Sequence, residues 1–133
     1  MSKIGEIGCV KAGFKCTDSG VGANRFVQLD VSECDATQTV VEQGGAGTKV
    51  FGITYETTAA ANRTVGVNLQ GICSLDVDGS QTGITAGDYL KSDATGKGVK
   101  SSTDTDEVGA VALEDSAAAN TITVEIRKIT LAG

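Results

Sequence analysis

The strongest constraint on the fold of this chain is an internal repeat. Residues 50–69 and residues 107–126 share one pattern of glycine, small residues and alternating apolar residues. Aligning Gly52 with Gly109 sets these repeat copies 57 positions apart and brings their apolar residues into register. A pattern that recurs at a fixed spacing indicates one supersecondary unit used twice. We therefore predict that the two copies fold alike.

Each copy has the pattern of a strand, a turn of small residues and a second strand. Apolar residues stand at every second position after the turn, which is typical of a half-buried strand because side chains alternate between the faces of a sheet. The turns fall at residues 59–63 and 116–120. We predict that Asn62 and Asn120 close them with positive φ, which asparagine tolerates. One helical turn across the alanines is the alternative, since alanine is the best helix former.

Further short strands are predicted outside the copies. Apolar alternation and turn residues place them at residues 25–31 (with Val27, Leu29 and Val31 on one face), 39–42, 71–77, 89–92 and 127–131. Residues 26–30 also resemble residues 89–93. The duplication is therefore expected to include the strand that precedes each copy.

Composition favours an all-β domain. The 133 residues include 18 glycines and no proline, and aromatic residues make up only 4%. A core of Val, Ile, Leu and Ala with glycine and aspartate turns predicts a small β-barrel or β-sandwich of short antiparallel strands, and alternation does not distinguish the two. We expect residues 1–13 to form an extended N-terminal arm or an edge strand, and residues 14–133 to form a single β domain.

Charge and composition exclude several functions. The net charge is −6 and there is no histidine. A nucleic-acid partner is not expected, because phosphate binding needs a basic face. The commonest general base and zinc ligand is missing. No apolar run approaches the ~20 residues of a membrane span, and no secretory h-region is visible, so we expect synthesis in a cytoplasm without export or membrane contact.

Two loops resemble ligand-binding motifs, and each has a simpler interpretation. Residues 44–49 (GGAGTK) lack the spacing and the following helix of a phosphate-binding loop, so a plain loop is favoured. Residues 76–79 (DVDG) begin like a calcium loop but lack its later ligands, so a hairpin turn is favoured. We expect no metal site and no cofactor.

Acidic clusters are the remaining candidates for chemistry. They consist of Asp104, Asp106 and Glu107, and of Glu114 with Asp115. Paired carboxylates can perform acid–base work if a pocket raises one pKa. These clusters lie in polar loops or beside turns, where carboxylates are normally solvated, so we expect that the protein is not an enzyme.

The four cysteines, Cys9, Cys16, Cys34 and Cys73, match no zinc template. The favoured interpretation is buried or half-exposed thiols. A bridge between Cys9 and Cys16 across a hairpin is the alternative, and the sequence leaves the oxidation state open.

Two stretches carry a family resemblance. Residues 84–97 read ITAGDYLKSDATGK, and residues 108–115 read VGAVALED. They resemble the capsid cement, or head decoration, proteins of tailed bacteriophages, which typically read aG-D-x-L-x-x-D-x-x-G-k and then v-x-G-x-A-l-e-d-a-a-a-G-x-x-V-x-V. The resemblance extends from about Arg25 onward and is strongest after Gly83. Asn120 stands where many members have glycine.

The resemblance implies a structural virion protein with a β-tulip-like fold. Such a protein would bind the outer surface of the phage head, bridge subunits of the major capsid protein and stabilise the expanded capsid. A homo-oligomer would be expected, a trimer rather than a dimer. The alternative is a soluble β-rich binding module, such as a tail or baseplate accessory domain or a carbohydrate-binding domain. The absence of tryptophan argues against a sugar platform.

The N-terminal segment is our candidate for the capsid contact. Its apolar positions, Ile4, Ile7 and Val10, are separated by glycine and charged residues, and Lys3 precedes them. Such a segment can order on a partner. It contains no motif of the family, and an ordinary edge strand is the alternative.

Overall fold

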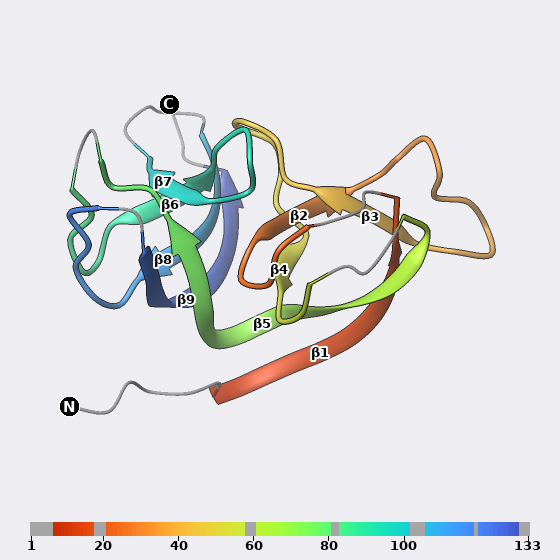
Figure 1. Cartoon of the computed structure of the whole chain (residues 1–133), viewed down its shortest axis with the longest axis horizontal. Coiled ribbons are helices and arrows are strands. Elements are labelled where there is room, and N and C mark those ends of the chain that lie inside the picture. Colours follow the sequence, from red (N-terminus) through yellow and green to blue (C-terminus); the bar gives the residue numbers. More distant parts are fainter. Residues whose placement is uncertain are drawn as a thin grey trace.

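The computed structural model describes residues 7–17, 21–57, 61–80, 83–101, 106–118 and 120–130. These residues contain no helix, and so none that could cross a membrane. They form nine strands in one connected mixed sheet (Figure 1). The strands are β1 (Ile7–Cys16), β2 (Phe26–Leu29), β3 (Val40–Gln43), β4 (Gly52–Thr54), β5 (Arg63–Val77), β6 (Tyr89–Ser92), β7 (Gly98–Lys100), β8 (Glu107–Ala112) and β9 (Asn120–Thr130). The predicted all-β class is confirmed, although the sheet is not a regular barrel.

Strand pairing closes two circuits that share β5. In the first circuit the neighbours run β1-β3-β2-β4-β5, and β5 pairs back to β1. In the second they run β5-β7-β6-β8-β9, and β9 pairs back to β5. Each circuit contains one short parallel pairing, which is between β1 and β3 in the first circuit and between β5 and β7 in the second. Figure 1 shows the second circuit on the left and the first on the right, with β5 running through both.

The two circuits have the same order of neighbours. β6, β7, β8 and β9 occupy the places of β2, β3, β4 and the first half of β5, and the second half of β5 occupies the place of β1. The register differs by one residue. Ile53 of β4 pairs with Asn68, whereas Ala110, 57 positions after Ile53, pairs with Ile126, 58 positions after Asn68. The shift accompanies an irregularity between Val108 and Ala110, since a bulge inserts one residue into a strand.

Residues 65–69 and 71–77, predicted as separate strand segments, belong to one strand of fifteen residues, β5. The strand bends at Gly71, where φ is +108°. A Cβ atom at this position would lie 2.7 Å from the carbonyl group of Gly8 in β1. Gly8 also has a positive φ, +62°, where the β1–β5 register is irregular. The two backbones therefore meet without side chains between them, and only glycine fits at Gly71.

Each circuit encloses a buried apolar cluster. The first cluster comprises Cys16, Val21, Val27, Val41, Val65 and Val67. The second comprises Phe26, Val50, Ile53, Cys73, Leu75, Val77, Ile84, Leu90, Ala110, Ala112, Ile122, Val124 and Ile126. Phe26 lies on β2 of the first circuit, yet its fully buried side chain packs in the second cluster. A Cβ atom on Gly109 would lie 2.7 Å from the side chains of both Phe26 and Val50, so glycine at this position of β8 lets the circuits pack closely.

The two asparagines of the repeat turns differ. Asn62 has φ of +64°, as predicted. The prediction for Asn120 is wrong, because this residue begins β9 and pairs with Val77 of β5. Its side-chain Oδ1 instead accepts a hydrogen bond of 2.6 Å from the Ser116 hydroxyl. A side-chain hydrogen bond thus helps to close this turn, where a positive φ at Asn120 was predicted.

None of the four cysteines forms a disulfide; Cys16 and Cys73 are buried and Cys9 and Cys34 are intermediate, as the favoured interpretation predicted. The alternative bridge between Cys9 and Cys16 is wrong. Both residues lie on the single strand β1, so seven residues at ~3.3 Å each hold them ~23 Å apart. A disulfide needs Cα atoms within ~7 Å.

Replacing Gly71 by alanine will destabilise the fold more than replacing Gly87. Both glycines have positive φ, +108° and +96°, but a Cβ atom at Gly87 would meet nothing within 4 Å. We expect Gly87→Ala to cost about 1 kcal/mol through backbone strain alone. Gly71→Ala should cost at least about 2 kcal/mol more because β1 must move away. Urea unfolding measures both, and equal losses would contradict the close backbone contact.

Candidate interaction surfaces

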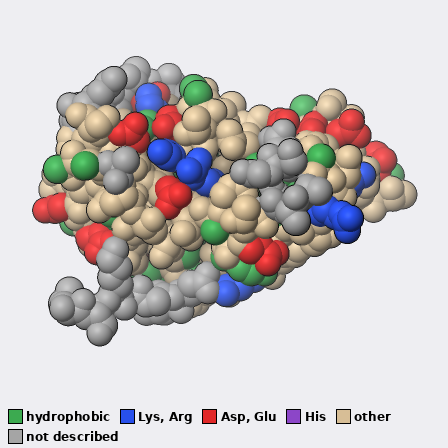
Figure 2. All heavy atoms as spheres, viewed as in Figure 1, with side chains coloured by type: hydrophobic (Ala, Val, Ile, Leu, Met, Phe, Trp, Pro, Cys, Tyr) green, Lys and Arg blue, Asp and Glu red, His purple; other side chains and the backbone are tan. Residues whose placement is uncertain are grey.

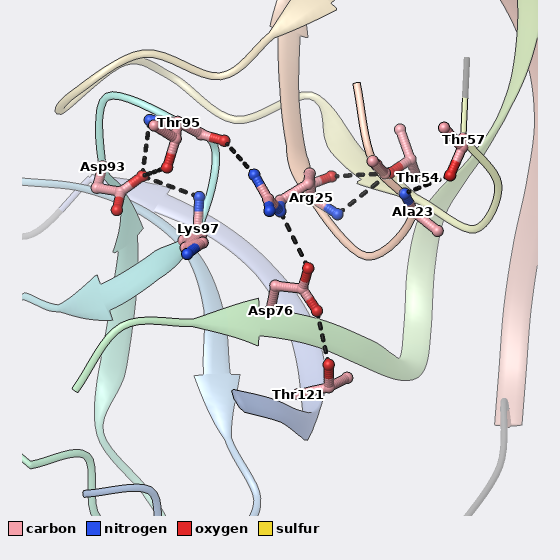
Figure 3. A network of polar contacts seen from close by, with 10 residues as sticks. Ala23, Arg25, Thr54, Thr57, Asp76, Asp93, Thr95, Lys97 and Thr121 are labelled. Carbon is pink, nitrogen blue, oxygen red and sulfur yellow. Dashed lines mark hydrogen bonds and ion pairs between the residues drawn. The ribbon is translucent and has the colours of Figure 1, made fainter. Parts of the chain in front are cut away.

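A polar network joins the two circuits (Figure 3). Arg25, which precedes β2, lies with its Nε 3.0 Å from Asp76 Oδ2 on β5. Its Nη1 donates to the backbone oxygen of Thr95, in the turn between β6 and β7, at 2.9 Å. The Thr121 hydroxyl of β9 donates to the other Asp76 oxygen at 2.6 Å. One guanidinium therefore connects the first circuit to two elements of the second.

Backbone hydrogen bonds reinforce this junction. The amide of Phe26 donates to the carbonyl of Gly96 at 2.8 Å, and the amide of Asp76 donates to the carbonyl of Asn24 at 2.7 Å. Asp93 orders the turn between β6 and β7, because its Oδ1 accepts hydrogen bonds from the amides of Thr95 and Lys97 (Figure 3). The junction fixes the relative positions of the two circuits.

An apolar hollow of about 290 Å³ lies beside the end of β2. Leu29, Val31, Val50 and Phe51 line it, and Lys49 lies at its edge. The predicted common face of Val27, Leu29 and Val31 is wrong beyond Leu29, where the strand ends. Val27 is buried, whereas Val31 is 79% exposed. Sequence reasoning placed Val31 on the same strand face as the buried Val27 and therefore missed this surface.

Asp30 holds the turn that presents Val31. Its carboxylate accepts hydrogen bonds from the hydroxyls of Ser32 at 2.7 Å and Thr17 at 2.8 Å. These bonds favour the ionised form, so the pKa of Asp30 lies below its ordinary value. The turn after β2 is thereby attached to the end of β1.

A second hollow, of about 270 Å³, adjoins the first and shares Lys49 and Val50 with it. Lys128 of β9 lines it, and its ammonium donates to the Phe51 carbonyl at 3.0 Å. The same ammonium lies 5.7 Å from the centre of the Phe51 ring. Desolvation there lowers the pKa of Lys128. Figure 2 shows Lys and Arg side chains gathered near the middle of one face, with acidic side chains around and beyond them.

The residues proposed for the capsid contact are only partly described. Lys3 and Ile4 lie outside the described residues. Ile7 begins β1 opposite Ile72 of β5. Val10, further along β1, is 44% exposed.

The acidic candidates for chemistry are placed separately. Asp106 accepts from the Ser101 hydroxyl at 2.8 Å and pairs with Lys91, and Glu114 accepts from the Thr123 amide. Other members of this set are Glu107, bound by the Thr130 hydroxyl, and Asp115, bound by the Ala86 amide; Asp104 lies outside the described residues. The described residues hold no group of three potential metal ligands. These carboxylates stabilise turns and strand ends.

Comparison with known proteins identifies the family. The family model for phage cement proteins matches residues 14–128. The chain belongs to the phage cement protein family. Its fold is similar to the crystal structure of the head fiber gp8.5 N base in bacteriophage phi29, with a TM-score of 0.63 and 18% sequence identity over 94% of this chain and 99% of that chain. No curated protein matches the chain significantly.

Membership confirms the family predicted from residues 84–97 and 108–115. This cement protein is a structural, capsid-associated protein of a bacteriophage virion. Its surfaces are therefore where contacts with the phage capsid are to be sought.

The junction should show measurable coupling between Arg25 and Asp76. Their side chains are only 22% and 27% exposed, so we expect a coupling energy of about 1 to 2 kcal/mol from a double-mutant cycle with Arg25→Met and Asp76→Asn. The control pair Arg127 and Glu125 is 48% and 41% exposed and should give below about 0.5 kcal/mol. Urea unfolding of the variants measures both. Equal coupling in the two pairs would contradict the role of the junction.

The lowered pKa of Asp30 predicts a contribution to acid stability. Because the folded pKa lies below the unfolded value of 3.8, this carboxylate stabilises the fold above that pH, and the contribution is lost as pH falls through the folded pKa. Thr17→Val removes one donor and should raise the Asp30 pKa in an NMR titration. Thr64→Val, on an exposed residue of β5, is the control and should leave it unchanged. An unaltered Asp30 titration in Thr17→Val would contradict the assignment.

Proposed function

We propose that this cement protein binds the outer surface of the expanded phage head and bridges subunits of the major capsid protein. The observation that carries the proposal is the family match over residues 14–128. It is supported by two circuits fixed to each other by the junction around Arg25. A rigid body resists separation of the subunits that it contacts. The protein is synthesised in the host cytoplasm and acts without catalysis.

Thermodynamic linkage explains how such binding would stabilise a head. A protein that binds only the expanded shell shifts the equilibrium toward that shell by mass action. A homotrimer would present the same contact three times and gain affinity through effective concentration. We therefore favour a trimer over a dimer.

β1 is the part of the fold that we assign to the capsid contact. None of residues 8–15 is fully buried, although they lie within a ten-residue strand. β1 pairs with β5 along its length and reaches β3 only at Lys15 and Cys16. A strand at a sheet edge can be covered by another chain. Val10, 44% exposed, would be covered together with the N-terminal residues that include Lys3 and Ile4.

Co-sedimentation tests this function. The purified protein should sediment with expanded empty heads of its phage and not with unexpanded shells. Val10→Asp should weaken binding to expanded heads about tenfold, because it places a charge in a covered apolar contact. Leu113→Asp, at a comparably exposed apolar residue beyond β8, is the control and should bind as wild type does.

The same preparations decide the oligomeric state. Sedimentation velocity of the free protein should give the mass of a trimer. If wild-type protein does not sediment with expanded heads, the proposed function is wrong. Normal binding by Val10→Asp would overturn only the contact assigned to β1.

A further inference from the structure

We propose that the apolar hollow beside β2, with Lys49 in its lining and Lys128 against Phe51 in the adjoining hollow, is a socket for a segment of a phage-head protein that carries an apolar side chain next to a carboxylate. This inference rests on the proposed function and specifies the partner chemistry of a second contact, separate from β1. The hollow, the two lysines and the packing between the circuits each support it.

The hollow supplies the apolar half of the contact. Val31 is 79% exposed and Leu29 is 37% exposed, and both line the hollow together with Phe51. A volume of about 290 Å³ accommodates a large aliphatic side chain with part of its backbone. Covering these groups removes apolar surface from water, which favours binding. Asp30 holds the Val31 turn in place before the partner arrives.

The lysines supply the charged half. Within the described part of the chain, neither Lys49 nor Lys128 lies within ion-pair distance of a carboxylate. Lys91 and Lys100, in contrast, pair with Asp106 and Asp88. The chain as a whole carries a net charge of −6. Lys49 and Lys128 are thus two cations beside an apolar hollow in an acidic protein, and they complement an acidic group.

Glu107 is the described carboxylate that lines the second hollow, and it already has a donor. The Thr130 hydroxyl donates to both of its oxygens at 2.9 and 3.0 Å. Glu42 accepts from the Gln28 amide at 2.7 Å. These bonds orient the two acids without neutralising the lysines.

Of the two lysines, Lys128 should bind a partner carboxylate more strongly. The residue is exposed overall, but its ammonium lies against the Phe51 carbonyl and ring. The resulting desolvation disfavours the charged form and lowers its pKa. An incoming carboxylate offsets this cost, and a charge-assisted hydrogen bond at a partly dehydrated ammonium is stronger than one in open solvent.

The position of the hollow makes the socket preformed. Lys128 comes from β9 of the second circuit, whereas Leu29 and Phe51 belong to the first. Packing of Phe26 and Val50 on Gly109 fixes these parts relative to each other. A preformed site loses little conformational entropy on binding.

The test measures the affinity of socket variants for expanded empty heads by co-sedimentation titration. Val31→Asp, Lys49→Glu and Lys128→Glu each change an exposed side chain and should each weaken binding about tenfold or more. Leu113→Asp and Arg63→Glu are the matched controls, since they make the same changes in charge at exposed residues outside both hollows. Controls should stay within about twofold of wild type. Thermal unfolding of every variant verifies that it is folded.

Cross-linking identifies the occupant directly. A photoreactive benzoyl-phenylalanine introduced at Val31 should capture a capsid or other head protein when the mixture with expanded heads is irradiated. Mass spectrometry of the product should place the cross-link within a few residues of an Asp or Glu. Capture of a second copy of this chain, or altered sedimentation of the free Val31→Asp protein, would show that the hollow is a subunit interface and would overturn the socket.

The remaining outcomes separate the two proposals. If wild-type protein binds heads and all three socket variants bind equally well, the socket is wrong and the cement function stands. If the socket variants bind weakly and the controls do not, the socket is supported. If wild-type protein does not bind heads, the proposed function is wrong and the socket is wrong with it.

Discussion

The structure depends on one strand that serves two circuits. β5 pairs with β1 and β4 through its first half and with β7 and β9 through its second half. It can do so because Gly71 bends it where the β1 backbone approaches closely. Any relative movement of the circuits would strain the hydrogen-bond ladder of β5. The shared strand therefore makes a repeated fold into one body.

The contacts between the circuits extend this constraint to the surface. Arg25 binds Asp76 and the Thr95 carbonyl, Phe26 fills the second core, and Lys128 reaches back to Phe51. The two surfaces that we propose for the capsid contacts lie on β1 and at the Lys128 contact, so both are held at a fixed distance. A protein that bridges capsid subunits needs this rigidity, because flexible bridges transmit little of their binding energy to the shell.

Acidic side chains stabilise turns at several places in the fold. Asp30, Asp93 and Asp115 each accept hydrogen bonds that order a turn. This explains how a chain with 17 acidic residues retains compact turns, because ionised carboxylates are strong acceptors for backbone amides. Lys49 and Lys128 lie beside the apolar surface of Phe51, and the socket proposal assigns them a partner carboxylate.

The sequence by itself determined the fold class and most strand positions, because alternation and turn residues act locally. It also indicated the family, through the motifs at residues 84–97 and 108–115. It placed β6 at its observed bounds, and it identified the repeat through Gly52 and Gly109. Only the tertiary structure decided that β5 is continuous, that Phe26 packs in the other circuit and that Val31 faces solvent. The physical reason is that strand pairing and burial join residues far apart in the chain, whereas periodicity reports only which residues alternate.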